Sequence, residues 1–103
     1  MKKLVRDKIP EIIKSNGEEC SYYIASSYEY NIELFKKLLE EALEVQKVKN
    51  KEELTEELAD VMEVIKAICI KNGINEDDIE KVRFEKKEKK GGFDYKIILK
   101  KDD

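Results

Sequence analysis

Four acidic side chains are spaced so that two helices would bring them to one place. Glu41 and Glu44 form a Glu-x-x-Glu pair, and Glu57 and Asp60 form a Glu-x-x-Asp pair further along the chain. Residues three apart lie on the same face of a helix, one turn apart. Each pair therefore presents two carboxylates side by side, and an antiparallel helical hairpin would turn the two pairs toward each other.

Converging carboxylates indicate a cation. Partly buried, they repel one another, and their pKa values rise unless a positive charge compensates. The four residues include neither His nor Cys, so the ligands are oxygen atoms, which favour Mg²⁺, with Mn²⁺ as a second choice. Mg²⁺ usually meets a substrate phosphate, and this predicts metal-assisted attack of water on a phosphoanhydride. The alternative is that each acidic pair is an ordinary solvated helix face.

The elements that would carry these carboxylates are predicted from capping signals. Ser or Asn followed by Glu or Asp three residues later is typical of a helix start, and Gly is typical of a helix end. Four helices are predicted on this basis. They run from Pro10 to before Gly17, from Ser26 to about Lys49, from Asn50 to Asn72 before Gly73, and from Asn75 to before Gly91.

Two further segments are rich in β-branched and aromatic residues, namely 20–25 and 93–100. Because an isolated strand leaves backbone groups unpaired, they are predicted to pair as a small two-stranded β element. The predicted fold is mainly α, in a single domain covering residues 1–103. Its core is a helical hairpin that forms a four-helix-type bundle, completed by dimerisation.

The dimer follows from the breadth of the apolar faces. The helix from Ser26 carries two apolar stripes, and the first is interrupted by a carboxylate; they are Leu34-Leu38-Glu41-Val45-Val48 and Phe35-Leu39-Ala42. The helix from Asn50 has a main apolar stripe beside an acidic-to-apolar one; they are Leu54-Leu58-Val61-Ile65-Ile68 and Glu53-Glu57-Asp60-Val64-Ala67. One hairpin cannot bury all these faces, whereas two hairpins can.

Composition excludes several classes of function. Charged residues make up 44% of the chain, yet its net charge is −3, which argues against nucleic-acid binding driven by bulk charge. The absence of His excludes His-based proton transfer. No apolar stretch is long enough to span a membrane, and the opening residues do not form a signal peptide, so a cytoplasmic location is expected. Cys20 and Cys69 are expected to be free thiols.

The acidic motifs also resemble those of a known family. Glu41-Ala-Leu-Glu44 and Glu57-Leu-Ala-Asp60 are similar to the ExxE…ExxD signature of the MazG-like, all-α NTP pyrophosphohydrolase superfamily. The opening LVRDKIPEII and the closing KKGGFDYKIIL resemble its small single-domain branch, the phosphoribosyl-ATP pyrophosphohydrolase-like proteins. The resemblance covers nearly the whole chain, with three motifs in the same order.

The resemblance implies a metal-dependent hydrolase. Members are helical bundles, assembled as homodimers or higher homo-oligomers, that cleave nucleoside triphosphates between the α and β phosphates. The products are the monophosphate and pyrophosphate, and the role is to clear unwanted nucleotides. By position, the Mg²⁺ ligands and catalytic residues are Glu41, Glu44, Glu57 and Asp60. That one glutamate instead orients the attacking water is an alternative, and the sequence leaves open which one.

Basic and aromatic residues complete the predicted site. Lysine and arginine can offset the charge of a triphosphate, and an aromatic ring can stack on a base. The predicted substrate contacts are Arg6, Lys8, Lys86, Lys89, Lys90 and Phe93; solvated surface side chains are the alternative. Two other functions stay open at this stage. One is a non-catalytic nucleotide- or metal-binding helical dimer with a regulatory or partner-docking role. The other is a purely structural dimer with acids on its surface.

Overall fold

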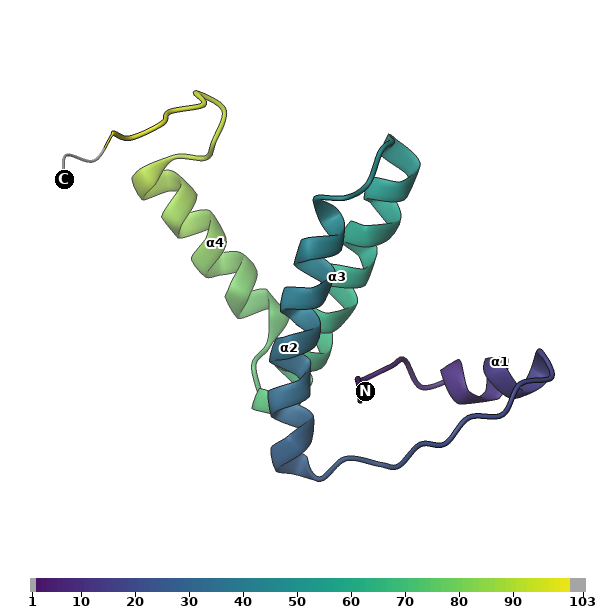
Figure 1. Cartoon of the computed structure of the whole chain (residues 1–103). Coiled ribbons are helices and arrows are strands. Elements are labelled where there is room, and N and C mark those ends of the chain that lie inside the picture. Colours follow the sequence, from purple (N-terminus) through teal and green to yellow (C-terminus); the bar gives the residue numbers. More distant parts are fainter. Residues whose placement is uncertain (1, 101–103) are drawn as a thin grey trace.

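A computed structural model describes residues 2–100. It contains four helices and, within those residues, no strand. Figure 1 shows two long helices side by side as an antiparallel hairpin, a third leaving it at an angle, and a short one standing off near the N-terminus. In chain order the helices are α1 (Ile9–Ser15), α2 (Ser27–Val45), α3 (Lys51–Asn72) and α4 (Glu76–Lys90). The hairpin is α2 and α3.

The predicted helix starts are confirmed by their caps. Each of the three longer helices begins after a Ser or Asn whose side-chain oxygen accepts a backbone N–H of the first turn, which satisfies one of the otherwise unpaired donors there. The bonds run from Glu29 N to Ser26 Oγ (3.1 Å), from Glu53 N to Asn50 Oδ1 (2.8 Å) and from Asp77 N to Asn75 Oδ1 (2.9 Å). Gly73 ends α3 with a φ of 66°, the left-handed conformation expected of it.

The end of α2 was predicted too late. The helix stops at Val45 instead of continuing to about Lys49. The N–H groups of Gln46 and Lys47 bond to carbonyls three residues back, at 3.2 and 3.0 Å, which is the tighter turn common at helix ends. The residues between this turn and Asn50 are needed to reverse the chain into α3.

The two-stranded β element predicted for residues 20–25 and 93–100 is not present. Neither segment is a strand, and Figure 1 shows them far apart, because α4 carries the C-terminal segment away from the hairpin. A turn also interrupts the second segment: Lys96 N bonds to Phe93 O at 3.1 Å, and Lys96 has a φ of 58°. Without a neighbour to pair with, an extended segment gains no ladder hydrogen bonds.

The core lies between α2 and α3, the one helix pair in broad contact within residues 2–100. On α2 the predicted inward stripe is confirmed, since Leu34 is only 2% exposed and Glu41 is half-buried. On α3 the stripe that faces α2 differs from the predicted main one. Val64 is buried, whereas Leu58 of the main stripe is 47% exposed.

The orientation of α3 about its own axis decides where its acidic side chains lie. Because the acidic-to-apolar stripe faces α2, Glu57 and Asp60 are turned into the hairpin and are half-buried there. The helix is apolar over a wide arc, so either stripe can supply packing contacts, and the choice leaves Leu54, Leu58 and Ile65 exposed.

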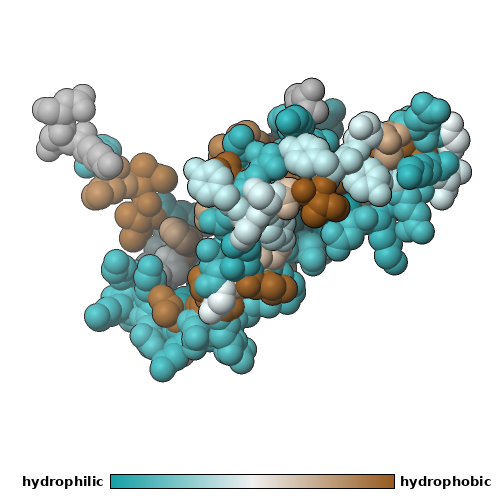
Figure 2. Space-filling view, turned by 90° about the horizontal axis from the view of Figure 1, so that it is seen from below, coloured by the Kyte–Doolittle hydropathy of each residue, from teal (hydrophilic) through white to brown (hydrophobic). Residues whose placement is uncertain are grey.

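The described chain has an open shape. Its radius of gyration is 17.8 Å, against about 13 Å for a compact domain of 100 residues. Large apolar side chains reach the surface among hydrophilic ones (Figure 2). On the hairpin these include Phe35, Leu39, Leu43, Leu58 and Met62. These faces are the ones for which a second hairpin was predicted, and the dimer stays a prediction.

Cys20 and Cys69 are free thiols, as predicted, and Cys69 is buried. Among the helices of residues 2–100, none combines the length and the apolar character needed to cross a membrane.

Candidate metal centre

Three carboxylates converge between α2 and α3, toward the end of the hairpin that carries its turn. Glu41 comes from the inward stripe of α2, and Glu57 and Asp60 come from successive turns of α3. One carboxylate oxygen of each lies within 4.8 Å of the other two, and all three residues are half-buried. We refer to Glu41, Glu57 and Asp60 as the acidic trio.

Glu57 is the electrostatic centre of the acidic trio. Its Oε2 is buried, and no hydrogen-bond donor among the described residues reaches it. Burial raises the pKa of Glu57, as do the charge of Asp60, the contact with the Glu41 carboxylate and the charge of Glu44. An unpartnered carboxylate oxygen in such a place is unfavourable. A cation bound there would relieve the repulsion among the three side chains.

Glu44, the fourth predicted ligand, stands beside the trio. It is half-buried, and its charge contributes to the raised pKa of Glu57. Its carboxylate is paired with Lys47 Nζ at 3.5 Å, and it does not belong to the group of converging oxygens. The structure thus brings together three of the four predicted carboxylates.

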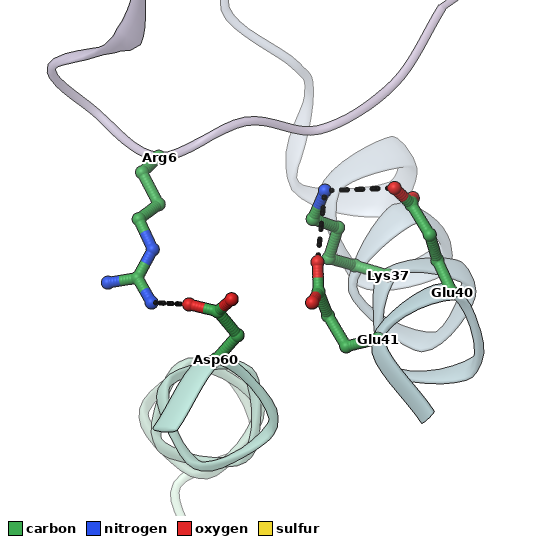
Figure 3. Close-up of polar contacts among 5 residues, drawn as sticks. All are labelled: Arg6, Lys37, Glu40, Glu41 and Asp60. Carbon is green, nitrogen blue, oxygen red and sulfur yellow. Dashed lines mark hydrogen bonds and ion pairs between the residues drawn. The ribbon is translucent and has the colours of Figure 1, made fainter. Parts of the chain in front are cut away.

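Two protein cations lie at the edges of the trio (Figure 3). Arg6, on the N-terminal segment that passes over the two helices, donates from Nη2 to Asp60 Oδ1 at 2.7 Å. Lys37 on α2 places its Nζ 3.6 Å from Glu41 Oε1 and 3.4 Å from Glu40 Oε1. Asp60 and Glu41 therefore each have a positive neighbour, whereas no ion pair with Glu57 is formed by residues 2–100.

Most of the other predicted substrate contacts lie elsewhere. Lys8 is exposed at the start of α1, and Phe93 is 97% exposed beyond α4. The remaining three are in the last turns of α4, which diverges from the hairpin (Figure 1); they are Lys86, Lys89 and Lys90. Of the predicted contacts, Arg6 is the one that the structure places at the trio.

Lys37 is a site residue that the sequence analysis missed. Its side chain is only 17% exposed, and it is the lysine nearest to the trio on α2. The signal was present in the sequence, because Lys37 precedes Glu41 by four residues, and side chains at that spacing meet on a helix.

The donor set of the acidic trio fits a hard divalent cation. All three side chains offer carboxylate oxygens, the ligand type that Mg²⁺ and Mn²⁺ take in proteins. The unpartnered Glu57 Oε2 is the specific observation behind this fit. Mg²⁺ keeps several waters and is commonly held by few carboxylates together with substrate phosphates, so a site of three half-buried carboxylates suits it.

Comparisons with protein-family models, with curated proteins and with solved structures find no match to this chain. The resemblance of its acidic motifs to the MazG-like signature is therefore carried by its own residues alone.

Proposed function

We propose that this protein is a Mg²⁺-dependent nucleoside triphosphate pyrophosphohydrolase. The observation that carries the proposal is the convergence of Glu41, Glu57 and Asp60, with Glu57 Oε2 buried and without a hydrogen-bond donor among the described residues. The motif resemblance supports the same activity. The reaction is attack of a water oxygen on the α-phosphorus and cleavage of the bond to the α–β bridging oxygen, which gives the nucleoside monophosphate and pyrophosphate.

In this proposal the acidic trio holds the cation, which supplies charge neutralisation at the phosphate oxygens when it is bound. Glu44 lies close enough for its charge to act on Glu57, and we assign to it the acceptance of a proton from the attacking water. Arg6 contributes its guanidinium at the open edge of the site, where it can donate to phosphate oxygens. The sum of these roles is electrostatic stabilisation and positioning.

The proposal includes a homodimer. Phe35, Leu39, Leu58 and Met62 expose apolar surface on the two helices that carry the trio. A second copy of the hairpin has the same helix lengths and apolar stripes, and covering the two surfaces with each other makes a four-helix bundle.

The test is a panel of NTPs and dNTPs incubated with Mg²⁺, with the products separated by chromatography. We expect monophosphate and pyrophosphate from at least one nucleotide, and a loss of at least about a hundredfold in rate for Glu57→Gln. Glu52→Gln is the matched control, because Glu52 is exposed on the same helix, outside the trio, and the charge change is identical. It should keep the wild-type rate.

Other outcomes would contradict the proposal in different ways. Diphosphate and inorganic phosphate as products would show that the cleaved bond is β–γ. No turnover together with a Mg²⁺-dependent rise in melting temperature would favour the non-catalytic metal- or nucleotide-binding dimer, since a ligand stabilises the state that binds it. Neither turnover nor a melting shift would favour the purely structural dimer.

A further inference from the structure

A small cavity with a positively charged lining lies beside the acidic trio. It has a volume of about 210 Å³ and is formed by the N-terminal segment at residues 2–4 and one side of α2. Its ionisable lining consists of four lysines and two glutamates, namely Lys2, Lys3, Lys36, Lys37, Glu33 and Glu40. We refer to this cavity as the lysine pocket. Its excess of positive charge favours an anion.

We propose that the lysine pocket binds the phosphate chain of the substrate, on the leaving-group side of the scissile bond. The inference rests on the proposed function and extends it, because it assigns the pyrophosphate portion to residues outside the acidic motifs. A phosphate chain has several negatively charged oxygens in a row, and lysine ammonium groups donate to such oxygens as mobile point charges.

Lys37 connects the lysine pocket to the acidic trio. It lines the pocket, and its Nζ is shared between Glu40 of the pocket and Glu41 of the trio, at 3.4 and 3.6 Å. Both distances are long for a charge-assisted hydrogen bond. When a cation neutralises Glu41, the ammonium group of Lys37 can donate instead to a phosphate oxygen that lies between the two sites.

The N-terminal segment also carries positive charges to both the lysine pocket and the trio. Lys2 and Lys3 line the lysine pocket, and Arg6 bonds to Asp60 of the trio (Figure 3), so one short stretch of chain contributes to both places. A chain of phosphates extending from the trio into the lysine pocket would therefore meet basic side chains from two independent elements, the N-terminal segment and α2.

The contacts that these lysines make in the structure are weak, so a bound polyanion can replace them. Lys36 is paired with Glu33 at 3.2 Å, and the Lys36 side chain is 70% exposed. Lys2 lies over the ring of Tyr23, 5.2 Å from its centre. Exposed ion pairs and exposed cation–π contacts each contribute little to stability. A bound phosphate chain offers these side chains several charged acceptors at once.

Calorimetric titration with inorganic pyrophosphate in the presence of Mg²⁺ tests the lysine pocket directly. The variant is Lys3→Gln with Lys36→Gln, since neither side chain contacts the acidic trio. The control is Lys81→Gln with Lys87→Gln, two exposed lysines of α4, which changes the net charge equally. We expect pyrophosphate to bind about tenfold more weakly to the pocket variant and within about twofold of wild type to the control.

A parallel titration distinguishes a site for a phosphate chain from a site for a single phosphate ion. Inorganic phosphate is titrated in parallel, and binding as tight as that of pyrophosphate would overturn the assignment of a phosphate chain. With a nucleoside triphosphate as substrate, the pocket variant should raise KM by about tenfold at a nearly unchanged kcat, if the pocket holds the substrate through its phosphates.

The inference and the proposed function can fail separately. If no nucleotide is hydrolysed but the pocket variant still loses pyrophosphate affinity, the result supports the phosphate-binding role of the lysine pocket and contradicts the proposed hydrolase activity. If Glu57→Gln abolishes turnover while the pocket variant matches the α4 control in pyrophosphate affinity and in KM, the hydrolase stands and the lysine pocket is overturned.

Discussion

At the scale of single residues, Glu57 is a member of the acidic trio whose pKa is shifted. Its pKa is raised above the ordinary 4.5, with burial as the largest cause. The folded state therefore holds the Glu57 proton more tightly than the unfolded state does. By linkage, this residue's contribution to stability declines as the pH rises from about 4.5 through the raised pKa, because the charged form is the disfavoured one.

Glu57→Gln removes that charge and keeps the shape of the side chain. In EDTA at neutral pH we expect the melting temperature to rise by about 3 °C, because repulsion with Glu41 and Asp60 is relieved. Adding Mg²⁺ should raise the melting temperature of the wild type and leave that of the variant unchanged. Thermal melts with and without Mg²⁺ measure both shifts in melting temperature. A variant that is less stable than wild type in EDTA would contradict the repulsion among the carboxylates of the trio.

Arg6 supports a second prediction at this scale. Its guanidinium bonds to Asp60 Oδ1 at 2.7 Å, so a cation at the trio must share or displace that contact. Arg6→Gln should therefore strengthen Mg²⁺ binding in the absence of nucleotide, by about threefold, since an exposed ion pair is worth little. Calorimetric titration with MgCl₂ measures the change. Lys14→Gln, on α1, is the control, and equal affinities of the two variants would show that Arg6 does not compete for Asp60.

At the scale of elements, local caps set where the long helices begin and where α3 ends. Ser26, Asn50 and Asn75 each accept an N–H from the first turn of a helix, and Gly73 closes α3 in the left-handed conformation. These features depend on residues within a few positions of one another. The hairpin turn between α2 and α3 brings the trio together, so the caps at Asn50 and Gly73 act on the site through the placement of α3.

Gly73→Ala tests the helix end. A Cβ at this position would meet no atom within 4 Å, so its cost is conformational, arising from the φ of 66°. We expect a loss of about 1 kcal/mol in the free energy of unfolding. Gly92→Ala is the control, because Gly92 lies outside the left-handed region and its Cβ would meet only Lys87 Cε at 3.8 Å. Urea denaturation of the two variants should separate them; equal stabilities would count against a left-handed Gly73.

At the scale of the whole molecule, the open shape leaves much apolar surface that the proposed homodimer would cover. The radius of gyration is 17.8 Å, and the described residues bury only Leu34, Val64 and Cys69 among the hydrophobic side chains. So small a core does not offset the conformational entropy of ordering a domain of this size. The exposed apolar side chains of α2 and α3 are where the additional burial would come from.

Leu39→Glu tests the homodimer. Leu39 is 64% exposed on α2, so a charge there would be tolerated in an isolated chain and would be buried in a four-helix bundle. Light scattering coupled to size exclusion should give the wild type twice the chain mass of 12.1 kDa and give the variant a mass close to 12.1 kDa at the same concentration. Ile24→Glu is the control outside the hairpin. A wild-type mass of one chain would refute the dimer.

The sequence by itself determined the features whose causes are local. Helix starts follow from a side chain bonding an N–H two or three residues away, and the Gly73 end follows from a conformation that glycine adopts freely. The carboxylate pairs follow from helical spacing, so three of the four predicted ligands, Glu41, Glu57 and Asp60, meet in the structure. Composition also predicted that the ligand set would offer oxygen atoms and no imidazole nitrogen, because the chain contains no His.

Tertiary structure decided everything that depends on contacts between distant segments. The rotation of α3 about its axis is set by packing against α2, and both of its stripes were compatible with the sequence until that contact chose the one with Glu57 and Asp60. The predicted strands fail for a similar reason, since pairing needs two segments that α4 holds apart. The lysine pocket exists only because the chain folds its N-terminal segment over α2, a long-range contact that no local pattern encodes.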